Sequence, residues 1–133
     1  MTDLPFVRPE KPLSESRLAL VTTGGVHLPE QERFDIDLAA GDCSYREIPG
    51  GAYTLTWTHA YYAPNHGTDL DSVFPLWTIR KLVAEGVVGE LNRRHFSFMG
   101  AIYDTSPLAE RTAPEVAGRL AEDGVDVVLL TPS

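Results

Sequence analysis

The feature that most constrains the fold is a run rich in valine and leucine, residues 125–130, near the end of the chain. Such a run predicts a strand that is buried on both faces of a parallel sheet. Before it, Thr112 is expected to cap a helix with Pro114 in the first turn, and Gly124 is expected to end that helix. A helix, a glycine and an apolar strand in this order indicate the second half of an α/β crossover unit.

The rest of the chain alternates in the same way between strand and helix patterns. We expect further strands at residues 17–23, 42–48, 53–59 and 94–99, and a helix after Pro75 that ends at Gly86. These elements predict a single α/β domain over residues 17–133, with three layers, a mainly parallel sheet and flanking helices in a Rossmann-like arrangement. Residues 1–16 have three prolines and no periodicity, so we expect an extended N-terminal arm. The strands at 17–23 and 125–131 should lie side by side in the sheet centre, both buried on two faces.

Composition narrows the classes of function. The 133 residues carry 19 acidic side chains against 11 Lys and Arg, a formal net charge of −8, so a nucleic-acid partner is not expected. The sequence has no 18-residue apolar run and no signal-peptide core, which predicts a soluble, cytoplasmic protein without a membrane partner. Cys43 is the one cysteine and can form no internal disulfide.

The four histidines are candidate metal ligands. His27 follows a Gly-Gly turn and His59 ends a predicted strand, and a site would need further ligands from Asp69, Asp71 or Cys43. No spacing matches an established metal motif, so we predict no metal site. Asp71 could also simply cap the helix that follows it.

The stretch GDCSYREIPG is the densest polar cluster between apolar segments. In an extended segment, Asp42, Ser44 and Arg46 share one face, and Arg46 could bind a substrate carboxylate with Asp42 orienting it. The alternative is a structural Asp–Arg pair on an edge strand, and this spacing favours it slightly. Cys43 is better explained as a small buried thiol than as a nucleophile.

A second polar stretch, RRHFSFMG, places two arginines beside His95. It could contact an anion or an acidic partner, and the alternative is a solvated turn. Nothing in the chain matches the motifs of serine hydrolases, P-loops or dinucleotide-binding folds.

Five stretches together resemble one family. In order they are VTTGGVHL, GDCSYREIP, THAYY, DLDSVFPLWTIRKLVAEGVVGEL and FSFMGAI. The chain resembles the selenoprotein B family, the substrate-specific subunits of glycine, sarcosine and betaine reductases, with the D-proline reductase small subunit as a relative. The resemblance runs from about Arg17 to Ser133.

This resemblance implies reductive cleavage of a C–N bond in a small amino acid or related amine. In the family a partner subunit's pyruvoyl group holds the substrate, and a selenocysteine or cysteine attacks the α-carbon. This chain holds no such cofactor itself, and it is expected to work in an oligomer with a pyruvoyl-containing subunit. Gly24, Gly25, Asp42, Ser44 and Arg46 would line the substrate pocket.

Two histidines would complete that pocket, since His27 and His59 are candidate acid/base groups for the departing amine. Together with the pocket residues they should converge near the carboxyl end of the strand at 125–131. In the family pattern the nucleophile comes after the position of Ser133, so we expect the gene to continue through a UGA or cysteine codon. The chain as written would then be inactive. The alternative is a non-catalytic module that binds a small molecule or serves assembly.

Overall fold

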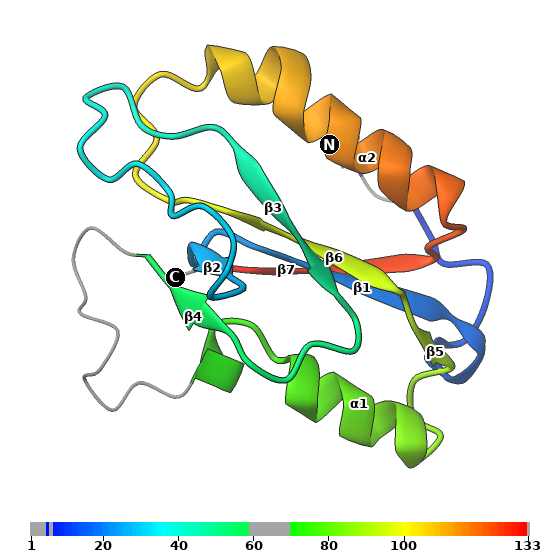
Figure 1. The fold of residues 1–133 in the computed structure, drawn as a ribbon. Helices are drawn as coiled ribbons and strands as arrows, with labels where there is room; N and C mark the ends of the chain where they lie inside the picture. The colour runs from blue at the N-terminus through cyan, green and yellow to red at the C-terminus, as the bar shows by residue number, and fades with distance from the viewer. Residues whose placement is uncertain (1–4, 6, 59–69, 133) are drawn as a thin grey trace.

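The computed structural model describes residue 5 and residues 7–58 and 70–132 (Figure 1). It is a mixed α/β domain built on one five-stranded sheet. The strands are β1 (Arg17–Thr22), β3 (Tyr45–Pro49), β5 (Glu90–Leu91), β6 (Arg94–Phe98) and β7 (Val127–Thr131). β1 lies between β7 on one side and β5 and β6 on the other, and β3 lies beyond β6.

The sheet is mainly parallel. β1 pairs in parallel with β5, β6 and β7, and the β3–β6 pair is antiparallel. A second, two-stranded antiparallel sheet joins β2 (Val26–His27) to β4 (Thr56–Trp57). Short 3₁₀ turns occupy Leu13–Glu15 and Leu70–Ser72.

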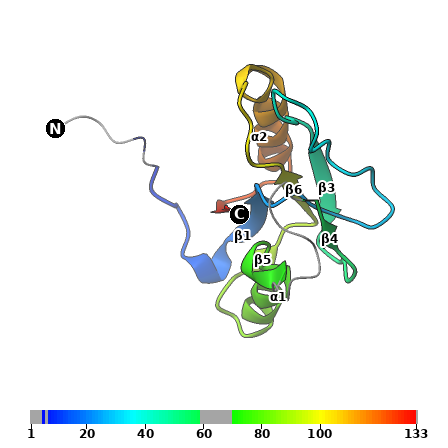
Figure 2. The ribbon, with the colours of Figure 1, turned by 90° about the vertical axis from the view of Figure 1, so that its left-hand side faces the viewer.

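Two helices cover opposite sides of the sheet (Figure 2). They are α1 (Leu76–Ala84) and α2 (Ala113–Glu122), and a π-helical turn, Leu108–Thr112, leads into α2. The alternation of side chains along β1 divides the core between them. Leu18 and Leu20 belong to the cluster under α1, and Ala19 belongs to the cluster under α2.

The predicted helices are present with one correction. Asp71 caps α1, because its Oδ1 accepts the backbone N–H of Trp77 at 3.0 Å and that of Thr78 at 3.3 Å. Pro114 lies in the first turn of α2 as predicted. The predicted cap at Thr112 is wrong: its side chain makes no capping hydrogen bond, because the preceding π-helical turn already continues into α2.

The two apolar strands lie side by side as predicted, but their burial differs. β7 pairs with β1 along its whole length. The prediction that β7 is buried on both faces in the sheet centre is wrong: Val128 is 39% exposed, Leu129 38% and Leu130 70%. Within the described residues β7 is an edge strand, and neither helix core includes these three side chains.

Other strand predictions hold in part. The segment predicted at 94–99 is β6, whereas the segment predicted at 42–48 is regular only from Tyr45 to Pro49. Of residues 53–59, only Thr56–Trp57 forms a strand among the described positions, and it lies in the small sheet. No helix in the described part of the chain is long and apolar enough to cross a membrane. The division into an arm at residues 1–16 and a domain at 17–133 stays a prediction.

Candidate functional site

The carboxyl ends of three parallel strands meet at one edge of the sheet. Thr23 donates its backbone N–H to the Thr131 carbonyl at 3.1 Å, which ties the end of β1 to the end of β7. Gly25 donates its N–H to the Phe98 carbonyl at 2.9 Å, which ties the same segment to the end of β6. β6 and β7 follow one another in the sequence but lie on opposite sides of β1. In open α/β sheets, ligands bind outside the carboxyl ends of the strands at such a change of side.

The glycine pair after β1 is explained by close packing. Gly25 has φ +67°, and a Cβ there would overlap the Thr58 carbonyl oxygen and lie 2.7 Å from Met99 Sδ. A Cβ on Gly24 would overlap Val73 Cγ1. Both positions therefore need glycine so that the turn can pass between the small sheet and the start of α1.

His27 is buried and both of its ring nitrogens are engaged. Nδ1 lies 2.7 Å from the Leu28 carbonyl oxygen, and Nε2 lies 2.9 Å from Thr58 Oγ1. Because a carbonyl can only accept, His27 Nδ1 donates its hydrogen to Leu28, while the Thr58 hydroxyl can either donate to Nε2 or accept from it. His27 thus lies buried at the base of the loop that follows β2, with both ring nitrogens in contact with polar atoms.

An aromatic ring links His27 to the predicted arginine. Phe34 packs edge-on against His27 with ring centroids 6.3 Å apart, and the Arg46 guanidinium carbon lies 4.2 Å from the centre of the Phe34 ring. Arg46 donates Nε–H to the Glu32 carbonyl at 2.8 Å and its NH2 group to the Arg33 carbonyl at 3.2 Å. Arg46 thus anchors the loop to β3 through the main chain.

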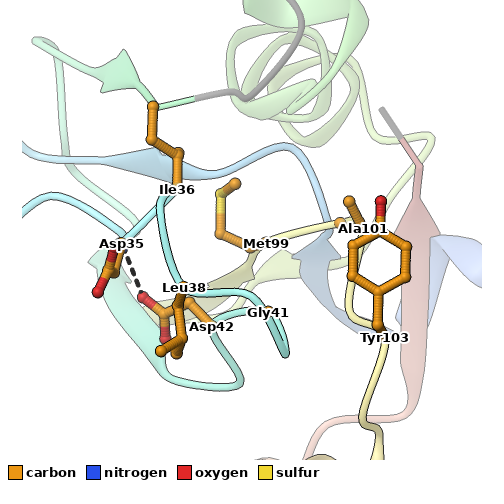
Figure 3. Close-up of a pocket in the computed structure, with 9 residues that line it drawn as sticks. Asp35, Ile36, Leu38, Gly41, Asp42, Met99, Ala101 and Tyr103 are labelled. Carbon is orange, nitrogen blue, oxygen red and sulfur yellow. Dashed lines mark hydrogen bonds between the residues drawn. The ribbon is translucent and has the colours of Figure 1, made fainter.

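Asp42, Ser44 and Arg46 form one hydrogen-bonded chain along the face that was predicted. Asp42 Oδ1 accepts from Ser44 Oγ at 2.6 Å, and Ser44 Oγ accepts from Arg46 NH1 at 3.0 Å. The second Asp42 oxygen accepts the Asp35 N–H at 2.8 Å (dashed in Figure 3). Burial by itself would raise the pKa of Asp42, but the hydrogen bonds from Ser44 and Asp35 outweigh it and hold the pKa below its usual value.

Beside Asp42 the surface holds a small pocket of about 110 Å³ (Figure 3). It lies between the loop at residues 35–42 and the segment at 99–103 that continues from β6. Met99 connects it to the glycine turn, because its Sδ lies close to Gly25. The lining contains two carboxylates and neither Lys nor Arg; its residues are Asp35, Ile36, Leu38, Gly41, Asp42, Met99, Gly100, Ala101 and Tyr103.

Of the residues predicted to line the pocket, only Asp42 lies in its lining, and the others are connected to it through the contacts described above. Gly24 and Gly25 adjoin His27 and Met99, and Arg46 reaches His27 through Phe34. His59 and Asp69 lie outside the described residues. The pocket residues Ile36, Leu38, Met99 and Tyr103 were not predicted. Met99 and Tyr103 follow β6, so the rule for carboxyl ends of strands could have found them, whereas Ile36 and Leu38 lie in the loop between β2 and β3 and carry no such signal.

The remaining candidates have structural environments. Cys43 is buried, and its Sγ lies 3.5 Å from the Asp104 carbonyl oxygen. His95 is fully buried, and Arg94 pairs with Asp123 at 2.7 Å, so the prediction of a solvated turn or an exposed anion contact at these two residues is wrong. Within residues 5, 7–58 and 70–132, no three His, Cys, Asp or Glu side chains are grouped to hold a metal ion.

Comparison with known proteins identifies the family. The model of the glycine/sarcosine/betaine reductase selenoprotein B family matches residues 1–133. The chain belongs to this family. D-proline reductase subunit gamma of Acetoanaerobium sticklandii is 38% identical over 124 residues, which cover 91% of this chain and 50% of that protein.

Other members match over a smaller share of their length. Glycine reductase complex component B subunit gamma of Peptoclostridium acidaminophilum is 32% identical over 130 residues, 91% of this chain and 28% of that protein. Betaine reductase complex component B subunit beta of the same organism is 30% identical over 131 residues, 92% of this chain and 29% of that protein. The chain thus spans half or less of these family members. No solved structure matches it.

Proposed function

We propose that this chain forms the substrate-binding part of a reductase component that cleaves a C–N bond in a small amino acid or related amine. Membership of the selenoprotein B family supports the reaction class, and the relatives are named as subunits of glycine, betaine and D-proline reductases. The observation that carries the proposal is the pocket beside Asp42, at the end of β6 and next to the glycine turn.

The size and charge of the pocket suit such a substrate. The pocket is small, at about 110 Å³, which suits a molecule of the size of glycine better than a large ligand. The lowered pKa of Asp42 keeps its carboxylate ionised near neutral pH, and no Lys or Arg lines the pocket to neutralise it. This lining favours the positively charged amino group of the substrate over its carboxylate.

The predicted site residues take distinct parts in this proposal. Asp42 faces the amino group, while Ser44 and Arg46 hold the loop through their hydrogen bonds to Asp42 and to main-chain carbonyls. Arg46 is therefore a positioning residue and does not contact the substrate in this proposal. His27 could act as the acid or base for the amine only by exchanging its contact with the Thr58 hydroxyl; the part of His59 stays a prediction.

The family chemistry also implies a selenocysteine or cysteine nucleophile, and a pyruvoyl group on a partner subunit. Cys43 does not fit the nucleophile, because it is buried and its sulfur faces the Asp104 carbonyl. We assign no chemical step to the described residues and propose that the nucleophile is supplied from outside them. We also propose that the domain has a Rossmann-like, three-layer arrangement and that it works as part of a multi-subunit assembly.

Substrate binding is the direct test. Titration of the chain with glycine, sarcosine, betaine and D-proline, followed by NMR, should shift the amides of residues 35–42 and 99–103. Leu38→Trp narrows the pocket and should weaken binding at least about tenfold, because even one extra methylene group in an apolar pocket changes affinity by about that factor. Leu13→Trp is the matched control, because Leu13 is equally apolar and exposed but lies outside the pocket.

The outcomes separate the two readings of the family resemblance. Shifts confined to this pocket, lost in the Leu38 variant and kept in the control, support substrate binding. Shifts elsewhere, or none with any of the four compounds, would refute it. Binding by this chain, with no amine release from a complete reductase complex that contains it, would instead favour the non-catalytic module.

A further inference from the structure

The outer edge of β7 is the largest uncovered apolar feature of the described sheet. Val128 and Leu130 point to one face and Leu129 to the other, because successive side chains of a strand alternate. All three are exposed, and Leu130 is the most exposed at 70%. Natural edge strands are usually protected by charged side chains or proline, and Val127–Leu130 contains neither.

The main chain of β7 also has an unpaired side. Thr131 directs its carbonyl toward β1, where it accepts the Thr23 N–H. Because alternate residues of a strand point their N–H and C=O groups to opposite sides, Val128 and Leu130 direct theirs away from β1. No strand among the described residues pairs with this side.

The apolar character of both faces decides what kind of occupant fits. A single added strand would pair with the open edge but would leave both faces of β7 in water. A second copy of this chain, joined edge to edge, would merge two uncovered apolar strips into a wider one. A strand that brings its own helices would cover the edge and both faces, as is usual in parallel sheets.

The family members that match this chain contain more polypeptide than it spans. D-proline reductase subunit gamma is matched over 50% of its length. We propose that β7 is an inner strand of the assembled reductase component, where its open edge pairs with a parallel strand from an α/β segment that corresponds to the unmatched half of that relative. This inference rests on packing and family membership, and is independent of the proposed substrate and chemistry.

Hydrogen exchange tests the proposal at two amides. In the 133-residue chain the N–H groups of Val128 and Leu130 should exchange rapidly at every protein concentration. In full-length D-proline reductase subunit gamma the two aligned amides should exchange at least about 100-fold more slowly, because they are paired there. Equal, rapid exchange in both proteins would overturn the proposal.

Substitution of the exposed leucine gives a second readout. Leu130→Lys should leave the melting temperature of this chain within about 2 °C, since its side chain is already in water. Lysine at the aligned position of the relative should lower the melting temperature by more than about 5 °C, because it would be buried there. Val87→Lys, at another exposed apolar side chain, is the control in this chain. Slow exchange that depends on concentration, with a doubled mass, would instead identify a second copy as the occupant and refute the proposal.

Discussion

At the scale of single residues, His95 fills a gap in the central sheet. β1 pairs with β5 at Leu18 and with β6 from Val21 onward, and between them the Leu20 N–H is donated to His95 Nδ1 at 2.8 Å. The imidazole thus replaces a backbone partner inside the core. Burial is the main cause that lowers the pKa of His95 to about 4; the Asn92 backbone raises it in part, and the charge of Arg80 lowers it.

This pKa predicts a specific pH dependence of stability. The pKa falls from 6.5 in the unfolded chain to about 4 in the folded one, so the unfolded state binds more protons between these values. The contribution of His95 is complete above pH 6.5 and is lost as the pH falls to 4, by about 3 kcal/mol in the free energy of unfolding. In His95→Asn, whose amide oxygen can accept the Leu20 N–H and does not titrate, this part of the slope should vanish.

Urea unfolding of both proteins between pH 4 and 7.5 measures the difference. The carboxylates titrate alike in the two proteins, so subtraction isolates the histidine. Parallel curves over this range would contradict the assignment.

A second residue, Asp123, should govern stability at lower pH. Its side chain is 1% exposed and accepts hydrogen bonds from Arg94 Nε at 2.7 Å and Asn92 Nδ2 at 2.9 Å. The hydrogen bond from Arg94 is the main cause that lowers the pKa of Asp123 to about 2, against burial, which would raise it. The stabilisation is therefore complete above about pH 4 and is lost as the pH falls toward 2.

The matched pair of variants is Asp123→Asn and Glu122→Gln. Removal of the buried charge takes away the one buried partner of Arg94 and leaves it with Glu47 and Glu122, which are more exposed, so it should cost about 3–5 kcal/mol at pH 7. Glu122 also faces Arg94, at 3.7 Å, but it is exposed, so its loss should cost less than about 1 kcal/mol. Denaturant unfolding at pH 7 compares the two, and equal losses would show that Asp123 is not the anchor of this ion-pair network.

At the scale of elements, the turn from β1 into β2 should be the segment least tolerant of an added methyl group. Gly25→Ala combines a left-handed φ with overlap against the Thr58 carbonyl, and should destabilise the fold by more than about 3 kcal/mol. Gly86→Ala also has a left-handed φ, +78°, but open space around it, and should cost only about 1 kcal/mol. Similar melting temperatures for both variants would mean that the turn can shift to admit the side chain.

The elements also show which structural features the sequence could predict. The strands at β1, β6 and β7 and the cap of α1 at Asp71 follow from local patterns of apolar residues and turn formers. The burial of β7 could not be predicted in the same way, because it depends on which elements lie beside the strand and not on its own composition. The π-helical turn before α2 was hidden for a similar reason, since Thr112 satisfies the local rule for a cap.

At the scale of the whole molecule, the candidate site combines predictable and unpredictable parts. The face shared by Asp42, Ser44 and Arg46 follows from strand geometry, and the structure confirms that the three residues are bonded to one another. The pocket beside them could not be predicted, because residues 35–42 and 99–103 have no periodicity and meet only through the path of the sheet. Whether these residues bind a substrate stays a proposal.

The hydrogen bonds that hold the loop after β2 determine which of its positions can vary in sequence. Arg46 holds the carbonyls of Glu32 and Arg33, Gln31 holds that of Glu47, and Asp42 holds the Asp35 N–H. These hydrogen bonds are made to main-chain atoms, so they do not depend on which side chains stand at the positions that are held. Under the proposed function, a mutational library at Ile36, Asp37 and Leu38 should therefore change ligand preference while the contacts that hold the loop remain intact.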